Sequence, residues 1–200
     1  MSEWGHHLRA CKLYGWNGTR VRELSMDEIT RALTTLDFSS TQTNVGNHFF
    51  MAGYQDLANG NVLDFTWLMP DTTKWIHWTW EIDTEKETLW QVYENAVATN
   101  PLANTITPLN SNRNSGNPSG TTLKYEVQTN LAGANADTAI GSATLLESGI
   151  SGAGQKAGDA NRINKLILKQ DTLYCLRATA NAAGYINFNM NWYEHTNEEA

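Results

Sequence analysis

The chain has 200 residues and a net charge of −7, from 14 basic and 21 acidic side chains. Hydrophobic residues make up 40% of it and charged residues only 18%, while Asn and Thr supply 21 and 23 positions. This is the composition of one globular domain rather than of a disordered chain. The acidic balance argues against a nucleic-acid partner, because contacts with the phosphate backbone need a basic surface.

Membrane and secretion signals are not apparent in the sequence. No apolar run reaches the roughly 18 residues that a membrane-spanning helix needs, and Met1–His7 lacks the basic and apolar regions of a signal peptide. We therefore expect no membrane partner and synthesis in the cytoplasm. Cys11 and Cys175 are far apart in the chain, and Cys175 has apolar neighbours, so a buried free thiol is expected there rather than a disulfide.

Residues 1–47 are predicted to form an N-terminal arm. A capping-box pattern at 25–28 and apolar residues at helical spacing are compatible with a short helix over 26–36, although the same segment would also suit an extended chain. Large apolar side chains are spread along a stretch too short to have its own core, so they must be buried on the β-domain or on a partner. These contact residues are Trp4, Leu8, Leu13, Tyr14 and Trp16.

Residues 48–197 are predicted to form a β-domain. Side chains alternate strictly between apolar and polar over Trp75–Asp83 and Tyr185–Tyr193, which is the period of a half-buried strand. Weaker alternation occurs at Val62–Met69, Thr88–Glu94, Thr122–Gln128, Ile163–Lys169 and Leu173–Thr179. The Asn-rich segment 100–120 and the Ala- and Gly-rich segment 131–159 are expected to be long loops.

About seven short strands without a helical period between them indicate an all-β fold. The prediction is an antiparallel β-sandwich or jelly roll with an extended N-terminal arm. Within it, the alternation places Trp78, Trp80, Trp90 and Trp192 in the core.

Candidate chemistry is sparse. The five histidines show no metal-ligand spacing and no neighbouring Cys pair, so no metal site is predicted. The chain has no Gly-x-Ser-x-Gly turn around a nucleophile, no recognisable Cys and His motif and no phosphate-binding loop. We therefore expect no catalytic residues, no cofactor and no enzymatic activity.

A sugar-binding surface is the alternative that the aromatic residues leave open. Exposed Trp beside polar side chains forms platforms for sugar rings, and Trp75 and His77 are placed at the start of one predicted strand. Asn112 and Arg113, in the Asn-rich segment, complete this alternative contact set.

Six stretches occur in the order expected for a group of tailed-bacteriophage head decoration proteins, also called capsid cement or stabilising proteins. They are Asn47–Phe50, Met69–His77, Tyr93–Glu94, Leu109–Ser115, Ile167–Tyr174 and Trp192–Thr196. Together they span most of the β-domain, which resembles this family, and Tyr14–Thr19 is similar to N-terminal arms of phage structural proteins.

The resemblance implies a virion protein made in the bacterial host cytoplasm. It implies binding to the major capsid protein on the outer surface of the assembled head, between neighbouring subunits, without any chemistry. It also implies self-association, with a homotrimer as the first expectation and a dimer as the second. The alternative within the same class is a β-sandwich module on a phage fibre that binds a glycan or receptor.

Overall fold

The computed structural model describes residues 14–16, 21–23, 38–98, 102, 104–128, 138–152, 158–161 and 165–196. The chain divides into two compact units, one formed by Met1–Phe38 with Glu198–Ala200 and the other by Ser39–Asn197. The second unit contains residues 48–197, which were predicted to form the β-domain. The predicted helix over 26–36 lies outside the described residues, and the helix that is described, α1, covers Phe38–Asn44.

In the first unit, two short strands are described, and they pair in antiparallel order. Strand β1 (Tyr14–Trp16) pairs with β2 (Val21–Glu23), so that Tyr14 lies opposite Glu23. Trp4, Leu8 and Leu13 of the predicted contact set lie outside the described residues.

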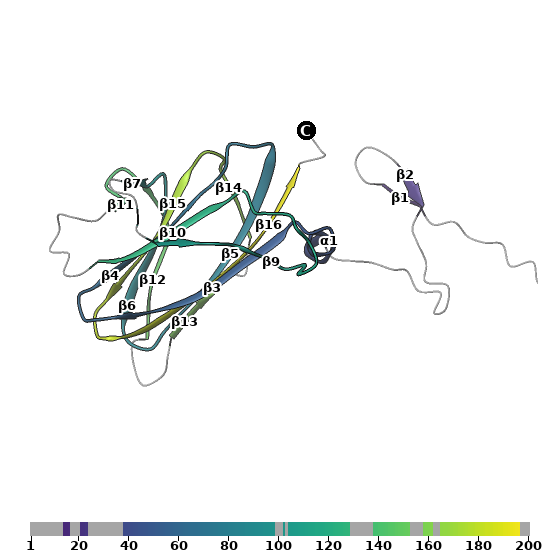
Figure 1. The fold of residues 1–200 in the computed structure, drawn as a ribbon. Helices are drawn as coiled ribbons and strands as arrows, with labels where there is room; N and C mark the ends of the chain where they lie inside the picture. Colours follow the sequence, from purple (N-terminus) through teal and green to yellow (C-terminus); the bar gives the residue numbers. More distant parts are fainter. Residues whose placement is uncertain are drawn as a thin grey trace, which may run out of the picture. The chain divides into compact units, whose positions relative to one another are not determined.

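The second unit consists of two six-stranded antiparallel sheets packed on each other (Figure 1), which confirms the predicted β-sandwich. The first sheet has the order β12 (Thr144–Ser151), β6 (Thr88–Glu94), β15 (Leu173–Ala180), β4 (Val62–Leu68), β10 (Thr122–Gln128) and β8 (Asn104–Ile106). The second has the order β13 (Gly158–Asn161), β5 (Lys74–Thr84), β16 (Gly184–Thr196), β3 (His48–Leu57) and β9 (Leu109–Asn110), with β14 (Leu166–Leu168) also paired to β5. A two-stranded ribbon joins β7 (Val97–Ala98) and β11 (Thr138–Ala139).

The connections follow the jelly-roll order. In chain order, β3, β4, β5 and β6 lie alternately in the second and the first sheet. The last strands continue this alternation, with β12 and β15 in the first sheet and β13, β14 and β16 in the second. Strand β6 pairs directly with β12. Strands β7 to β11 form an insertion between β6 and β12, from which β8 and β10 extend the first sheet and β9 the second. The insertion therefore widens both sheets at the side where β4 and β3 would otherwise be edge strands.

Segment 131–159 was wrongly predicted to be one long loop. Residues 144–151 form β12, an eight-residue strand at the edge of the first sheet. Its side chains are mostly exposed, and its register shifts between Leu145 and Glu147. A strand that buries few side chains lacks the apolar alternation on which the prediction depended.

A stack of four aromatic rings crosses the core from one sheet to the other. Tyr174 lies parallel to Trp67 at 5.9 Å between ring centroids, Trp67 to Trp78 at 5.3 Å, and Trp78 to Trp192 at 4.4 Å. All four side chains are buried, and each contributes about 1.5–3 kcal/mol or more through the apolar surface it removes from water. The stack ties β15 and β4 to β5 and β16. The predicted core positions Trp78, Trp80, Trp90 and Trp192 are confirmed, since none is more than 5% exposed.

Candidate functional site at one end of the sandwich

The six sequence stretches that carry the resemblance lie at the same end of the sandwich. The strand register shows this, because β3 begins and β16 ends there, with His48 opposite Tyr193. Strand β4 ends where β15 begins, with Leu68 opposite Leu173, and β6 also ends there, with Glu94 opposite Tyr174. The start of β5, the end of β14 and β9 with its following loop complete this end, which we call the Glu194 end. Residues up to about 150 positions apart in the chain thus form one local region.

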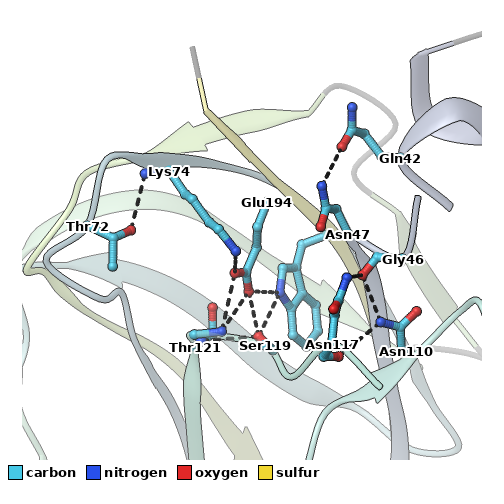
Figure 2. A network of polar contacts seen from close by, with 12 residues as sticks. Gln42, Gly46, Asn47, Thr72, Lys74, Asn110, Asn117, Ser119, Thr121 and Glu194 are labelled. Atoms are coloured by element: carbon cyan, nitrogen blue, oxygen red, sulfur yellow. Dashed lines mark hydrogen bonds and ion pairs between the residues drawn. The ribbon is translucent and has the colours of Figure 1, made fainter. Parts of the chain in front are cut away.

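Glu194 is the central buried group of this end (Figure 2). Its side chain is 1% exposed, and its carboxylate accepts hydrogen bonds from the Ser119 hydroxyl at 2.6 Å, the Gly120 N–H at 3.1 Å and the Trp192 indole N–H at 3.2 Å. The Lys74 ammonium lies 3.9 Å away. A buried carboxylate needs such compensation, because desolvation of its charge is costly. Glu194 thereby fixes the segment around Ser119 to the end of β16.

The Asn-rich loop after β9 is held by its own side chains. The Asn110 side-chain oxygen accepts from the N–H of Asn112, and that of Asn112 accepts from the N–H of Asn114. The hydroxyl of Ser115 accepts from the N–H two residues on, and so does that of Ser119. Repeated turns of this kind explain why the segment is rich in Asn and Ser, since both side chains mimic a backbone turn. Within the described part of the insertion, low sequence complexity therefore encodes a defined conformation.

Asn110 anchors this loop to the rest of the sandwich. It is 8% exposed, and its amide donates to the carbonyl of Gly46 at 2.8 Å and to that of Asn117 at 3.1 Å (Figure 2). Gly46 has a φ of +76°, and an added Cβ would lie 2.2 Å from the Ser115 hydroxyl oxygen. Only glycine is accommodated at this close approach of two loops.

A row of aromatic and imidazole rings crosses the outer face of the second sheet at the same end. His77 on β5, Tyr193 on β16 and His48 on β3 lie opposite one another in the register. The His77 ring stacks on Tyr193 at 4.5 Å between centroids, and the His48 ring lies 6.5 Å from Tyr193 on the other side. The Lys165 ammonium lies over Tyr193, 4.7 Å from the ring centroid. We call His48, Tyr193 and His77 the imidazole row.

His195 lies beside this row and contacts it directly. Its Nε2 is 2.9 Å from Nε2 of His77, so that one of the two nitrogens donates and the other accepts. Its Nδ1 is 3.1 Å from the Thr196 carbonyl, which can only accept, so this nitrogen carries a proton. In the neutral pair, His77 is therefore the donor and His195 the acceptor.

The surroundings of the imidazole row disfavour protonation of its two histidines. Burial lowers the pKa of His77 to about 4, with smaller electrostatic contributions from His195 and Lys165. Burial and Lys165 also lower the pKa of His48, whose Nδ1 is 2.6 Å from the Ser111 hydroxyl. Both rings are consequently neutral at physiological pH.

The four residues of the predicted glycan set lie on one sheet but in two places. Trp75, 39% exposed, lies opposite His195 at the start of β5, and His77 is two residues further along. Asn112 and Arg113 follow β9 and are separated from β5 by β16 and β3. The amide of Asn112 donates to the Asn44 carbonyl at 3.0 Å, and Arg113 donates to the Asn110 carbonyl at 3.3 Å. These two side chains thus have structural partners in the loop.

A shallow depression of about 370 Å³ lies elsewhere on the outer face of the second sheet. Its lining consists of Ala52, Gly53, Tyr54, Asp83, Asn187 and Asn189. The Tyr54 ring contacts Tyr185 edge-on at 6.1 Å, and both rings are at least half exposed. The sequence prediction missed this group. Alternation within one strand shows which of its residues share a face, but the register between strands is needed to show that residues of different strands lie side by side.

The described residues contain no group of three or more His, Cys, Asp and Glu side chains placed to hold a metal ion. In that same part of the chain, no helix is long and apolar enough to cross a membrane. Within these residues Cys175 is buried and forms no disulfide, as expected. Comparisons with protein-family models, with curated proteins and with solved structures returned no match to this chain.

Proposed function

We propose that the protein is a structural component of a tailed-bacteriophage virion that binds the outer surface of the assembled head. In this proposal it lies between neighbouring subunits of the major capsid protein and stabilises them, as a homotrimer or a dimer. Its activity is binding, and no cofactor takes part.

One observation carries the proposal. The six stretches that resemble decoration proteins are scattered along the sequence, yet they lie together at the Glu194 end. Stretches that resembled a family by coincidence would be distributed over both ends and both sheet faces. Their common location supports a shared framework rather than six chance similarities.

The N-terminal residues supply the contact set in this proposal. The compact unit with the sandwich begins at Ser39, and Met1–Phe38 belongs to a separate unit. The residues of the contact set all precede the sandwich, and the described core consists of side chains from residues 49–192: the set is Trp4, Leu8, Leu13, Tyr14 and Trp16. A segment rich in large apolar residues can bury these side chains on a partner protein, and it does so without folding around a hydrophobic core of its own.

Stabilisation follows from mass action. A protein that binds only the assembled shell favours that state by RT ln(1 + [L]/Kd), which is about 2.7 kcal/mol per site at a hundredfold excess over Kd. Repetition over many equivalent sites makes this contribution large for the whole shell, even where each site is weak.

Immunogold labelling of virions from the phage that encodes the chain tests the proposal, with an antibody raised against the purified protein. Dense gold over the head is the expected result. Gold confined to the tail, or no gold on the virion, contradicts head decoration.

Cosedimentation with capsids that lack the protein tests the contact set. Trp4→Ala and Trp16→Ala are expected to lower occupancy, because aromatic anchors dominate binding energy at interfaces. Trp75→Ala, which alters an exposed tryptophan of the sandwich, is the matched control and should leave occupancy unchanged.

The exposure of Trp75 favours a second candidate function, a glycan-binding module of a phage fibre. A 39% exposed indole beside His195 offers a flat apolar face with a polar neighbour, which suits a sugar ring. The test is a thermal melt with soluble host-surface glycans. A rise in Tm that is lost in Trp75→Ala supports this candidate, whereas no rise in Tm with any glycan contradicts it.

A further inference from the structure

We propose that His77 and His195 form a binding site for a late divalent transition-metal ion, Ni²⁺ or Cu²⁺. The two imidazoles would occupy neighbouring coordination positions, and water would fill the others. The inference is independent of the proposed function, because it depends only on the geometry of these two side chains.

The distance between the two nitrogens carries the inference. Nε2 of His77 and Nε2 of His195 face each other at 2.9 Å, although 118 positions separate the residues in the chain. Imidazole nitrogens bind such ions at about 2.0–2.1 Å, and an ion at that distance from both nitrogens subtends an angle of about 90°. This is the angle between neighbouring ligands in tetragonal and octahedral coordination, so an ion could replace the shared proton at a point off the line that joins the two nitrogens.

Both rings are already held in place. His77 and His195 lie diagonally across the paired strands β5 and β16, and the Tyr193 ring stacks on His77 at 4.5 Å between centroids. Nδ1 of His195 donates to the Thr196 carbonyl, which leaves its Nε2 lone pair directed at the site. A hydrogen bond from the second ring nitrogen is the typical support of a metal-ligating histidine, since it fixes the tautomer and the ring orientation.

The choice of metal follows from the ligand type and the angle. Imidazole suits Ni²⁺, Cu²⁺ and Zn²⁺, and the affinity of nitrogen ligands for divalent ions rises to a maximum at Cu²⁺. Tetrahedral Zn²⁺ would need the nitrogens about 3.3–3.4 Å apart, further than the 2.9 Å observed. Lys165, whose ammonium lies over Tyr193, opposes any cation here, so moderate rather than tight binding is expected.

The test is titration of the full-length chain with NiCl₂ by isothermal calorimetry at about pH 7.5. The adjacent His6 and His7 are themselves able to bind metal, so the measurement uses a background with His6→Gln and His7→Gln. The expected result is one ion per chain. Cu²⁺ bound to the same protein should give an electron paramagnetic resonance spectrum with splitting from two nitrogens.

Substitutions locate the site. His77→Gln and His195→Gln should each weaken binding at least about tenfold, since even loss of an outer-shell partner costs about 10–100-fold in metal affinity. His48→Gln is the matched control, because His48 is a neutral imidazole in the same row that does not contact the pair, and it should bind as the background does. Circular dichroism melts without metal establish that each variant is folded.

Two results would overturn the inference. One is the absence of saturable binding up to about 1 mM free Ni²⁺, and the other is equal affinity of the background and His77→Gln. If both histidine variants failed to fold, substoichiometric Cu²⁺ would be added to the isotope-labelled background protein. Broadening centred on His77, His195 and Tyr193 then supports the site, and broadening centred elsewhere contradicts it.

Discussion

Asp64 and Arg177 form a two-point ion pair across strands β4 and β15. The Asp64 carboxylate is 0% exposed and accepts from Nε and Nη2 of Arg177, both at 2.7 Å. The pair lies on the outer face of the first sheet, opposite to the face that contributes Phe65 and Trp67 to the core. A buried charge on a sheet face is tolerated only with a partner of such geometry.

Arg177→Met is expected to destabilise the protein by about 3–5 kcal/mol, because it leaves the Asp64 charge buried without its partner. The measurement is urea unfolding at neutral pH. The double variant Asp64→Leu with Arg177→Met should recover much of the loss, since no charge then remains buried. Lys86→Met, which removes an exposed ion pair with Glu85, is the control and should change stability by less than about 1 kcal/mol. Equal losses in all three variants would contradict the argument.

Glu194→Ala is expected to cost about 2–4 kcal/mol, because the Trp192 indole N–H, the Gly120 N–H and the Ser119 hydroxyl lose their common acceptor. The loss should be largest locally, so hydrogen exchange of the loop around residues 110–121 should accelerate. Lys74→Ala should cost less than about 1 kcal/mol, as that ammonium is 43% exposed and 3.9 Å away. A similar effect of both substitutions would show that the ion pair, not the hydrogen bonds, dominates.

Glu94 should make stability depend on pH in the acid range. Burial acts to raise its pKa, but hydrogen bonds from Lys169 at 2.6 Å and from the Tyr174 hydroxyl at 2.9 Å outweigh it and hold the pKa below its usual value of 4.5. The unfolded chain therefore binds a proton at Glu94 more readily than the folded one, and the stabilisation is complete above pH 4.5 and lost as pH falls through the folded pKa.

The comparison is between the wild type and Glu94→Gln in urea unfolding from neutral pH to below pH 4. The variant should be less stable at neutral pH, and its stability should decline less steeply on acidification. Parallel curves for the two proteins would exclude a contribution from Glu94.

Gly149→Ala is expected to destabilise the protein by about 1–3 kcal/mol through overpacking. An added Cβ would lie 2.6 Å from the Trp90 ring, and that ring is fixed because it is buried and donates to the Ser151 hydroxyl. Gly141→Ala is the matched control, since nothing lies within 4 Å of an added Cβ there. Thermal melts of both variants decide the question, and an unchanged Tm in Gly149→Ala would mean that Trp90 can move aside.

The sequence predicted best the strands that are buried on one face. Thr88–Glu94 and Thr122–Gln128 coincide with β6 and β10, and β5 and β16 extend their predicted ranges by only one to three residues at an end. Alternation is visible there because alternate side chains enter a common core. In β12 most side chains are exposed, so this strand was not predicted. The loop after β9 lies in segment 100–120, which was predicted to be a loop, but the turns that its Asn side chains form were not predicted.

The sequence drew attention to the residues of the Glu194 end only through the six stretches that resemble decoration proteins, and their contacts with one another were not predicted. Alternation along β16 places Tyr193 and His195 on one face, but their approach to His77 depends on how β16 pairs with β5. Pairing between strands distant in sequence depends on connections that a single sequence does not specify. Glu194 shows the same limit, since its acceptor role requires Ser119 and Gly120 from a loop 74 or more positions away.

The position of β16 has a consequence for how the protein folds as it is synthesised. This strand pairs with both β5 and β3 in the interior of the second sheet, yet it begins at Gly184, long after β3 ends at Leu57. During synthesis on the ribosome, β3 and β5 therefore lack their common partner strand until residues 184–196 have emerged. Such long-range pairing is typical of slow folding, in milliseconds to seconds, and exposes apolar strands such as Trp75–Ile82 to aggregation in the meantime. We expect folding yield to depend on chaperones and on temperature more strongly than the stability of the finished protein does.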